Sequence, residues 1–146
     1  MLVKKAIKLL SITILSLFFI SNSFSIEPKD FVQQTVDKAA KALDQNLSKD
    51  LKISKLKVIA LKSVDIKGIG FYSLGKYRKN ISDQKKEEYL EIFTQYFLKT
   101  FSSRLAQYSD PKIIVNSQKK LNDKYTMVSS TLIATDDKPE VKVDWR

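Results

Sequence analysis

The sequence predicts an α+β domain in which N-terminal helices pack on a twisted antiparallel β-sheet, and two observations lead to this class. Apolar residues recur every three or four positions through much of the first part of the chain, which is the pattern of amphipathic helices. After Asp110-Pro111, short stretches instead are rich in β-branched residues or alternate between apolar and polar side chains. Because the helical stretches precede the strands and do not alternate with them, we expect a sheet with the connectivity of a meander.

Residues 1–25 have the organisation of a cleavable secretory signal peptide. A start that contains three lysines is followed by the uncharged, mostly apolar run Leu9–Ile20, and the small residues Ser23 and Ser25 precede the expected cut. The apolar run is shorter than the roughly 20 residues that span a bilayer, which favours cleavage over an uncleaved membrane anchor. We therefore expect residues 26–146 to form a single domain that acts outside the cytoplasm.

Three helices are predicted in the first half of this domain. Pro28–Leu47 has apolar residues on one face and charged residues on the other, with a proline suited to its first turn. Lys49–Lys62 is shorter and more ambiguous, but its spacing favours a helix. Val64–Tyr77 predicts a short helix that ends near Gly75, a residue able to adopt the left-handed cap conformation. Two further glycines inside this segment weaken it by about 1 kcal/mol each relative to alanine.

Asp83–Gln107 is the longest predicted helix and the one with the strongest sequence signals. Ser82 is a favourable N-cap, and Asp110-Pro111 marks the end of the run. An apolar stripe at helical spacing consists of Leu90, Phe93, Phe97, Phe101 and Leu105, and Tyr89, Ile92 and Tyr96 widen it. A surface helix does not need so large an aromatic area, so this helix is expected to be central to the fold or to line an apolar site.

The remaining chain predicts three strands, over Lys112–Gln118, Tyr125–Thr135 and Glu140–Arg146. Turns are predicted at Asn122-Asp123 and at Asp136-Asp137-Lys138, where aspartate and asparagine form local hydrogen bonds. The sequence stops inside the last strand pattern. We expect either a frayed edge strand or a sheet that is incomplete at its C-terminal end.

The composition excludes several classes of chemistry. There is no histidine and no cysteine, so a Ser-His-Asp relay, thiol catalysis and thiolate zinc sites are ruled out. The carboxylate pairs Glu87/Glu88 and Asp136/Asp137 are expected on a solvated helix face and in a turn, where nothing would shift their pKa values toward catalysis. We expect a protein that is not an enzyme and that needs no metal or cofactor.

One segment, Gly70–Lys76, matches the spacing G-x-x-x-x-G-K of phosphate-binding loops. In such a loop the next residue is Ser or Thr, which binds magnesium, whereas here it is Tyr77. The interior of the segment is also bulky, although a phosphate cradle requires close approach of the backbone. We interpret it as a helix with a glycine cap in which Phe71 and Leu74 are buried.

With these classes of chemistry excluded, the positive net charge and the large apolar area of the predicted domain are the features that indicate a ligand. Removing the predicted signal peptide lowers the net charge from +10 to +7, a balance that attracts phosphate groups. Export argues against nucleic acid as the partner and favours lipid headgroups. An apolar pocket with lysines at its mouth would suit a phospholipid. The residues expected to contact acyl chains are Phe71, Leu74, Leu90, Phe93, Phe97 and Phe101, followed by Val115, Ile133 and Val143.

The order and spacing of several segments carry a resemblance to a known family. These segments are Val64-Asp65-Ile66, Phe71–Tyr77, Gln84 with Glu87, Glu88 and Tyr89, the aromatic residues Phe93, Phe97 and Phe101, the region Tyr108–Val115, and Val143–Arg146. Together they resemble the MlaC family, also called the toluene-tolerance family. The chain departs from the family pattern at Gly68, Gly70 and Arg78.

The resemblance implies a soluble periplasmic carrier that holds a phospholipid by its acyl chains. It implies as partners an outer-membrane lipoprotein complex and an inner-membrane ABC transporter, and a role in outer-membrane lipid asymmetry. The family continues past the last strand with another strand and a terminal helix, so the resemblance also predicts a C-terminally truncated domain. Two alternatives stay open: an exported, non-enzymatic adaptor that binds a partner protein, and a truncated family member without function.

Overall fold

The computed structural model describes residues 26–136 and 138–146. The predicted signal peptide, residues 1–25, therefore lies outside the described residues, as does Asp137 of the predicted turn. In chain order the elements are α2 (Pro28–Ala42), α3 (Lys49–Ser63), α4 (Ile66–Ser73), the 3-10 helix η2 (Gly75–Lys79), α5 (Asp83–Leu105), β1 (Ile113–Lys120), β2 (Thr126–Leu132) and β3 (Val141–Trp145). Helices thus precede strands, as the sequence predicts.

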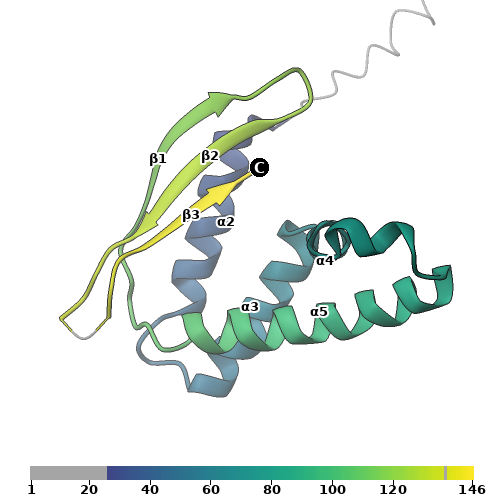
Figure 1. Cartoon of the computed structure of the whole chain (residues 1–146). Helices are drawn as coiled ribbons and strands as arrows, with labels where there is room; N and C mark the ends of the chain where they lie inside the picture. The colour runs from purple at the N-terminus through teal and green to yellow at the C-terminus, as the bar shows by residue number, and fades with distance from the viewer. Residues whose placement is uncertain (1–25, 137) are drawn as a thin grey trace, which may run out of the picture.

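The elements form two groups that meet at one end of α5 (Figure 1). In one group α2 lies across the sheet and packs on β1 and β2. In the other group α5 packs on α3 and α4, and α2 also contacts α3. This arrangement confirms the predicted α+β class, but α2 is the helix with extensive packing on the sheet.

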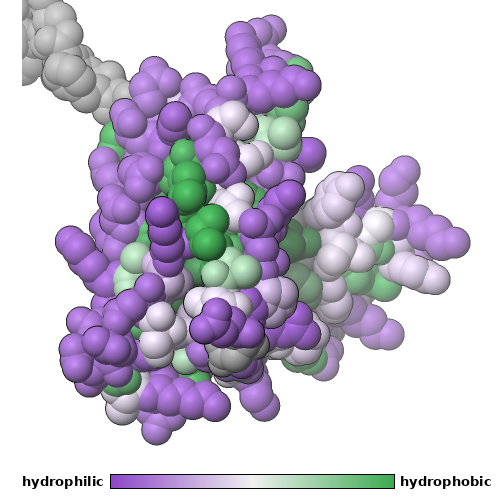
Figure 2. Space-filling view, turned by 90° about the vertical axis from the view of Figure 1, so that its left-hand side faces the viewer, coloured by the Kyte–Doolittle hydropathy of each residue, from purple (hydrophilic) through white to green (hydrophobic). Residues whose placement is uncertain are grey.

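The strands form a three-stranded antiparallel sheet in the order β1-β2-β3, which confirms the predicted meander. The register pairs Ile113 with Leu132, and Leu132 in turn with Val141. The pairing of β1 with β2 shifts between Val115 and Gln118, as at a β-bulge. From the side on which the sheet lies, Figure 2 shows a mostly hydrophilic surface with a small group of apolar side chains in its middle.

α2 ends at Ala42, five residues before the predicted end at Leu47. The reason is a turn with its own hydrogen bonds: the Asp44 carboxylate accepts bonds from the backbone and the side-chain amide of Asn46, at 2.8 and 3.0 Å. The carbonyl of Leu43 also accepts a bond from the backbone N–H of Asp110, at 3.0 Å. The local bonds of Asp44 and the long-range bond to Leu43 both offer the backbone an alternative to the helix.

α3 begins at Lys49 and α5 at Asp83, as predicted, and a serine caps the start of each helix. The hydroxyl of Ser48 accepts a hydrogen bond from the backbone N–H of Leu51, and that of Ser82 accepts one from the N–H of Lys85. In the first turn of α5, Lys86 donates a 2.8 Å hydrogen bond to Asp83, which together with its positive charge lowers the pKa of the Asp83 carboxyl. α5 ends at Leu105, close to the predicted Gln107.

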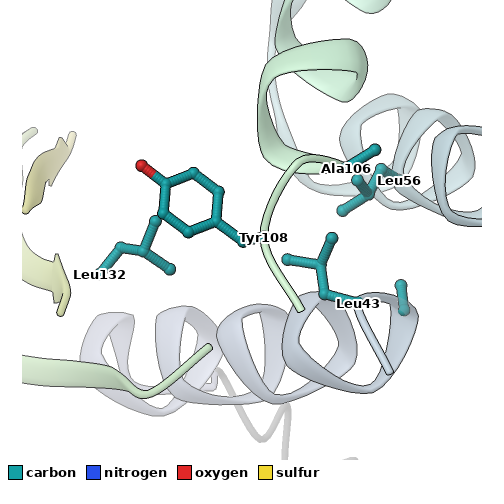
Figure 3. Close-up of a cluster of buried hydrophobic side chains, with 6 residues drawn as sticks. Leu43, Leu56, Ala106, Tyr108 and Leu132 are labelled. Carbon is teal, nitrogen blue, oxygen red and sulfur yellow. The ribbon is translucent and has the colours of Figure 1, made fainter. Parts of the chain in front are cut away.

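One buried cluster joins the two groups of elements. It contains Ala42, Leu43, Leu56, Ala106, Tyr108 and Leu132. In Figure 3 the ring of Tyr108 lies between Leu132 on the sheet and the leucines of the helices. The Tyr108 hydroxyl donates a 3.2 Å hydrogen bond to the carbonyl of Pro139. A second cluster holds α2 on the sheet through Val32, Val36 and Val128.

Candidate functional site

A ladder of aromatic rings runs along α5. The ring centroids of Tyr89 and Phe93 are 5.9 Å apart, those of Phe93 and Phe97 are 6.3 Å apart, and those of Phe97 and Phe101 are 5.5 Å apart. These separations are within the range of favourable aromatic contacts. We call these four residues the aromatic ladder. Their spacing of four residues places them on one face of the helix, as the sequence predicts.

The ladder is only partly covered by protein. Among the residues of α5, only Ser102 is buried, and its hydroxyl is bonded to the carbonyl of Leu98. Leu90 and the ladder residues Phe93, Phe97 and Phe101 are half-buried. An ordinary core helix would bury side chains of this size, since aromatic residues contribute most of their stabilisation through burial. The partial exposure therefore leaves apolar area on α5 available for a ligand.

α4 contacts α5 closely through Gly70. A Cβ atom at this position would lie 2.7 Å from Cδ1 of Phe93 and 3.1 Å from Cδ2 of Leu90, which is too close for ordinary packing. A 2.7 Å hydrogen bond between the hydroxyls of Ser73 and Tyr89 holds the two helices together at the next turn. The position of Phe93 in the ladder thus depends on the absence of a side chain at Gly70.

The two predicted site residues of the α4 segment are less buried than expected. Phe71 is 38% exposed, so the expectation that it is buried is wrong. The guanidinium carbon of Arg78 lies 5.7 Å from the centroid of its ring. Leu74 is half-buried at the end of α4. Gly70 and Ser73 of this helix contact α5, whereas Phe71, one residue after Gly70, stays exposed.

The three predicted site residues of the sheet do not lie together. Val115 packs against the cluster of Val32, Val36 and Val128, which makes it part of the contact between α2 and the sheet. Val143 is 38% exposed on β3, opposite Ser130. Ile133 follows β2 and is half-buried, and its backbone N–H is bonded to the carbonyl of Lys112.

Alternation along the strand decides which of these residues share a face. Val115 and Val143 both pair with Ser130, so their side chains lie on the same face of the sheet as the buried Leu132. Ile133 follows Leu132 directly and is therefore expected on the opposite face. Of the three predicted site residues in the sheet region, only Val143 combines a position on the face that α2 covers with substantial exposure.

The segment Gly70–Lys76 does not form a phosphate-binding loop. Its first four residues are the last turn of α4, and Gly75, with φ of +53°, begins η2. The left-handed conformation at Gly75 confirms the predicted helix cap. Helical backbone amides bond within the helix, so they are not free to cradle a phosphate.

A shallow hollow of about 220 Å³ lies where α3 ends and α4 begins, against the middle of α5. It is lined by Leu61, Val64, Asp65, Ile66, Lys67 and Thr94. The sequence does not predict this hollow, because its lining comes from three elements and no single stretch has a pattern that indicates it. Thr94 lies beside Phe93 in the sequence, so the hollow borders the α5 helix on a flank of the ladder.

Beyond the apolar ladder, the described residues show few features of a metal site, a buried charged site or a membrane span. In residues 26–136 and 138–146, no three acidic side chains gather as a metal site would require. Lys52 is buried, and its ammonium donates a 3.0 Å hydrogen bond to the hydroxyl of Ser109. None of the helices that the structure describes combines the length and apolar character needed to cross a bilayer. The apolar ladder is the most distinctive feature of this part of the chain.

Comparison with known proteins identifies the family. The family model for the MlaC protein matches residues 32–146, which include the ladder, η2 and all three strands. The chain belongs to the MlaC family. No curated protein matches the sequence directly. The resemblance found in the sequence is thus confirmed.

A solved structure shares the fold of this MlaC-family chain. It is the phospholipid-binding protein of Ralstonia solanacearum, determined in complex with a phospholipid. The TM-score is 0.63 at 13% identity, and the match covers 82% of this chain and 70% of that chain. At this identity, the similarity supports the α+β fold.

Proposed function

We propose that this chain is a periplasmic phospholipid carrier that holds acyl chains against the aromatic ladder of α5. The single observation that carries the proposal is the half-exposed ladder in a chain of the MlaC family. The Ralstonia protein of the same fold was solved with a phospholipid, which supports the same class of ligand here. A carrier of this kind performs no covalent chemistry.

The dimensions of the ladder suit an acyl chain. Tyr89 and Phe101 are separated by about 18 Å along the helix axis at a rise of about 1.5 Å per residue. The hydrocarbon core of a bilayer is about 30 Å thick, so the acyl layer of one leaflet spans about 15 Å. The ladder therefore offers an acyl chain ring contacts along most of its length, and the phosphate would remain near solvent and the lysine-rich surface.

We also propose that the chain has the cellular role that the resemblance to the MlaC family implies. Residues 1–25 direct export and are removed, and the mature chain, residues 26–146, moves through the periplasm. Its partners are an outer-membrane lipoprotein complex and an inner-membrane ABC transporter, between which it passes phospholipid. This exchange contributes to the lipid asymmetry of the outer membrane.

Substitution of Phe97 tests the proposal, because Phe97 is the central ring between two ladder neighbours. The protein is mixed with liposomes and then separated from them. We expect Phe97→Ala to retain at least about fivefold less phospholipid than the unmodified protein, since the loss of a contact of about 1 kcal/mol or more changes a binding equilibrium by that factor. Mass spectrometry of the organic extract measures the retained phospholipid per mole of protein.

The matched control is Tyr96→Ala, on the same helix. Tyr96 is 64% exposed, and no ring contact involves it among those found in the described part of the chain. This variant should retain phospholipid as the unmodified protein does. Unmodified protein that acquires no phospholipid from liposomes would refute the carrier proposal, and equal losses in the two variants would refute the role of the ladder.

A further inference from the structure

Exposed tyrosines and positive side chains follow one another in the segment from the end of α4 through η2. This segment lies at the end of the helical group that is farthest from the sheet (Figure 1). We call this surface the basic tip. It consists of Tyr72, Lys76, Tyr77, Arg78 and Lys79, from the end of α4 and from η2. Tyr72 is 78% exposed and Tyr77 is 64% exposed, and the three cationic side chains are exposed as well.

The charge of this segment has one sign. Every charged residue from Ile66 to Ser82 is a lysine or an arginine. None of the salt bridges found in residues 26–136 and 138–146 involves Lys76, Arg78 or Lys79. The positive charge of the tip is therefore not neutralised within the described part of the molecule, and it is available to an external anion.

The tip has a defined geometry. The Lys76 ammonium lies 5.7 Å from the ring centroid of Tyr77, and the Arg78 guanidinium carbon lies 5.7 Å from that of Phe71. Both distances are within the range of cation–π contacts. The left-handed turn at Gly75 sets the direction of η2 relative to α4. Tyrosines and cations are thus held side by side on one protruding end.

This combination of side chains matches the chemistry of a membrane surface. Tyrosine has an apolar ring and a polar tip, which suit the layer where headgroups meet acyl chains. Lysine and arginine near an anionic bilayer are attracted to its lipid phosphates. An acidic protein surface would be attracted to the cations, but it gives no reason for two tyrosines to project into solvent. The pairing of both kinds of side chain therefore favours a bilayer.

We propose that the basic tip docks on the headgroup layer of an anionic membrane. Docking in this way would bring the end of α5 from which the ladder starts toward the bilayer, because Tyr89 of the ladder is bonded to Ser73 of α4. The proposal goes beyond carriage of a phospholipid in solution. It does not require that the ladder be occupied, so the two proposals can fail separately.

Binding to vesicles tests the proposal with protein that begins at Ile26, which contains every element described. The vesicles are of phosphatidylcholine alone or of phosphatidylcholine with phosphatidylglycerol, and sedimentation measures the bound protein. We expect binding to the anionic vesicles at low salt, little binding to the neutral ones, and weakening at high salt. One lysine or arginine near an anionic surface strengthens the binding constant by about fivefold. The double variant Lys76→Gln/Lys79→Gln should therefore weaken binding to the anionic vesicles roughly 25-fold.

The matched control is Lys119→Gln/Lys124→Gln, which removes the same charge from the hairpin between β1 and β2. Neither of these side chains is part of the salt bridges of the described residues, and both are exposed. Vesicle binding by this variant should fall less than threefold. Equal losses in the two double variants would overturn the proposal, because binding would then follow net charge and not the tip.

A second variant separates the tyrosine from the charge. Tyr72→Ser removes the most exposed aromatic ring of the tip and leaves its cations in place, so it should weaken binding to the anionic vesicles severalfold even at high salt. Unchanged binding would contradict insertion of this ring. Unmodified protein that does not bind anionic vesicles at low salt would overturn the docking proposal outright, and it would leave an acidic protein as the occupant of the tip. Extraction of retained phospholipid from the same samples reports independently on the ladder.

Discussion

At the scale of single residues, Gly70 matters most for the position of the aromatic ladder. The absence of a side chain allows Phe93 and Leu90 to approach the backbone of α4. In a helix, glycine costs about 1 kcal/mol relative to alanine. The close contact between α4 and α5 offsets that cost, which explains how a glycine-containing segment forms a stable helix here.

We therefore predict that Gly70→Ala destabilises the protein, although alanine is the better helix former. Overpacking costs about 1–3 kcal/mol, and the gain in helix propensity is about 1 kcal/mol, so the free energy of unfolding should fall by about 1 kcal/mol. Urea denaturation measures the change. In a Phe93→Ala background the same substitution should be neutral or stabilising, since the ring that it meets is gone. An equal effect in both backgrounds would disprove the contact.

At the scale of elements, the sequence predicts the four α-helices and the three strands of the described residues, but not the 3-10 helix η2 that begins at Gly75. The N-cap serine Ser82 marks the start of α5, and β-branched stretches mark the strands, because these signals are local. The end of α2 is the largest error. Besides the Asp44 turn, it depends on the hydrogen bond that joins Asp110 to Leu43, residues far apart in the sequence, which no local pattern reveals.

The candidate site is also only partly predictable, because its exposure depends on contacts between residues that are far apart in the sequence. Helical spacing places Phe93, Phe97 and Phe101 on one face, and the rings indeed stack in that order. Spacing does not tell whether a face is covered, so it could not show that Val115 lies in the core while Val143 stays exposed. Exposure depends on which helix covers which strand, and this is a tertiary property.

The start of α4 provides a further prediction at this scale. The Asp65 carboxylate accepts a 2.9 Å hydrogen bond from the backbone N–H of Gly68, and a Cβ atom at Gly68 would overlap that carboxylate. Asp65→Ala removes the cap and should lower the free energy of unfolding by about 1 kcal/mol, while Asp65→Asn should cost only a few tenths. Hydrogen exchange of the α4 amides should rise in the alanine variant.

Asp65→Asn is the control for charge in this experiment. It keeps an oxygen that can accept the hydrogen bond but removes the negative charge at the helix start. If the asparagine variant lost as much stability as the alanine variant, the helix dipole and not the cap would account for the effect. The double variant Asp65→Ala/Gly68→Ala should regain stability relative to Asp65→Ala, since the overlap disappears and alanine favours the helix.

At the scale of the whole molecule, the two groups of elements depend on one shared cluster. Leu43 follows α2, Leu56 belongs to α3, and Leu132 belongs to β2, so this cluster contacts both groups. Leu43 and Leu56 are fully buried. The ladder, by contrast, contributes no buried side chain, since all four of its residues are half-buried. The molecule thus concentrates its shared core at one end of α5 and leaves the apolar face along the rest of the helix only partly covered.

We predict that the two groups unfold together and that Leu43→Ala weakens both. Removal of a buried leucine side chain costs about 2–5 kcal/mol, and the fully buried position of Leu43 favours a value of about 3 kcal/mol. Trp145, the single tryptophan, reports on β3 by fluorescence, and far-ultraviolet circular dichroism reports mainly on the helices.

For the unmodified protein the two urea transitions should coincide, and Leu43→Ala should move both midpoints downward by the same amount. Leu61→Ala is the control, because Leu61 is 58% exposed and its loss should change stability by less than about 0.5 kcal/mol. If the fluorescence and dichroism midpoints separated in the unmodified protein, the sheet with α2 and the group of α3, α4 and α5 would be independent folding units. The shared cluster would then not be the element that couples them.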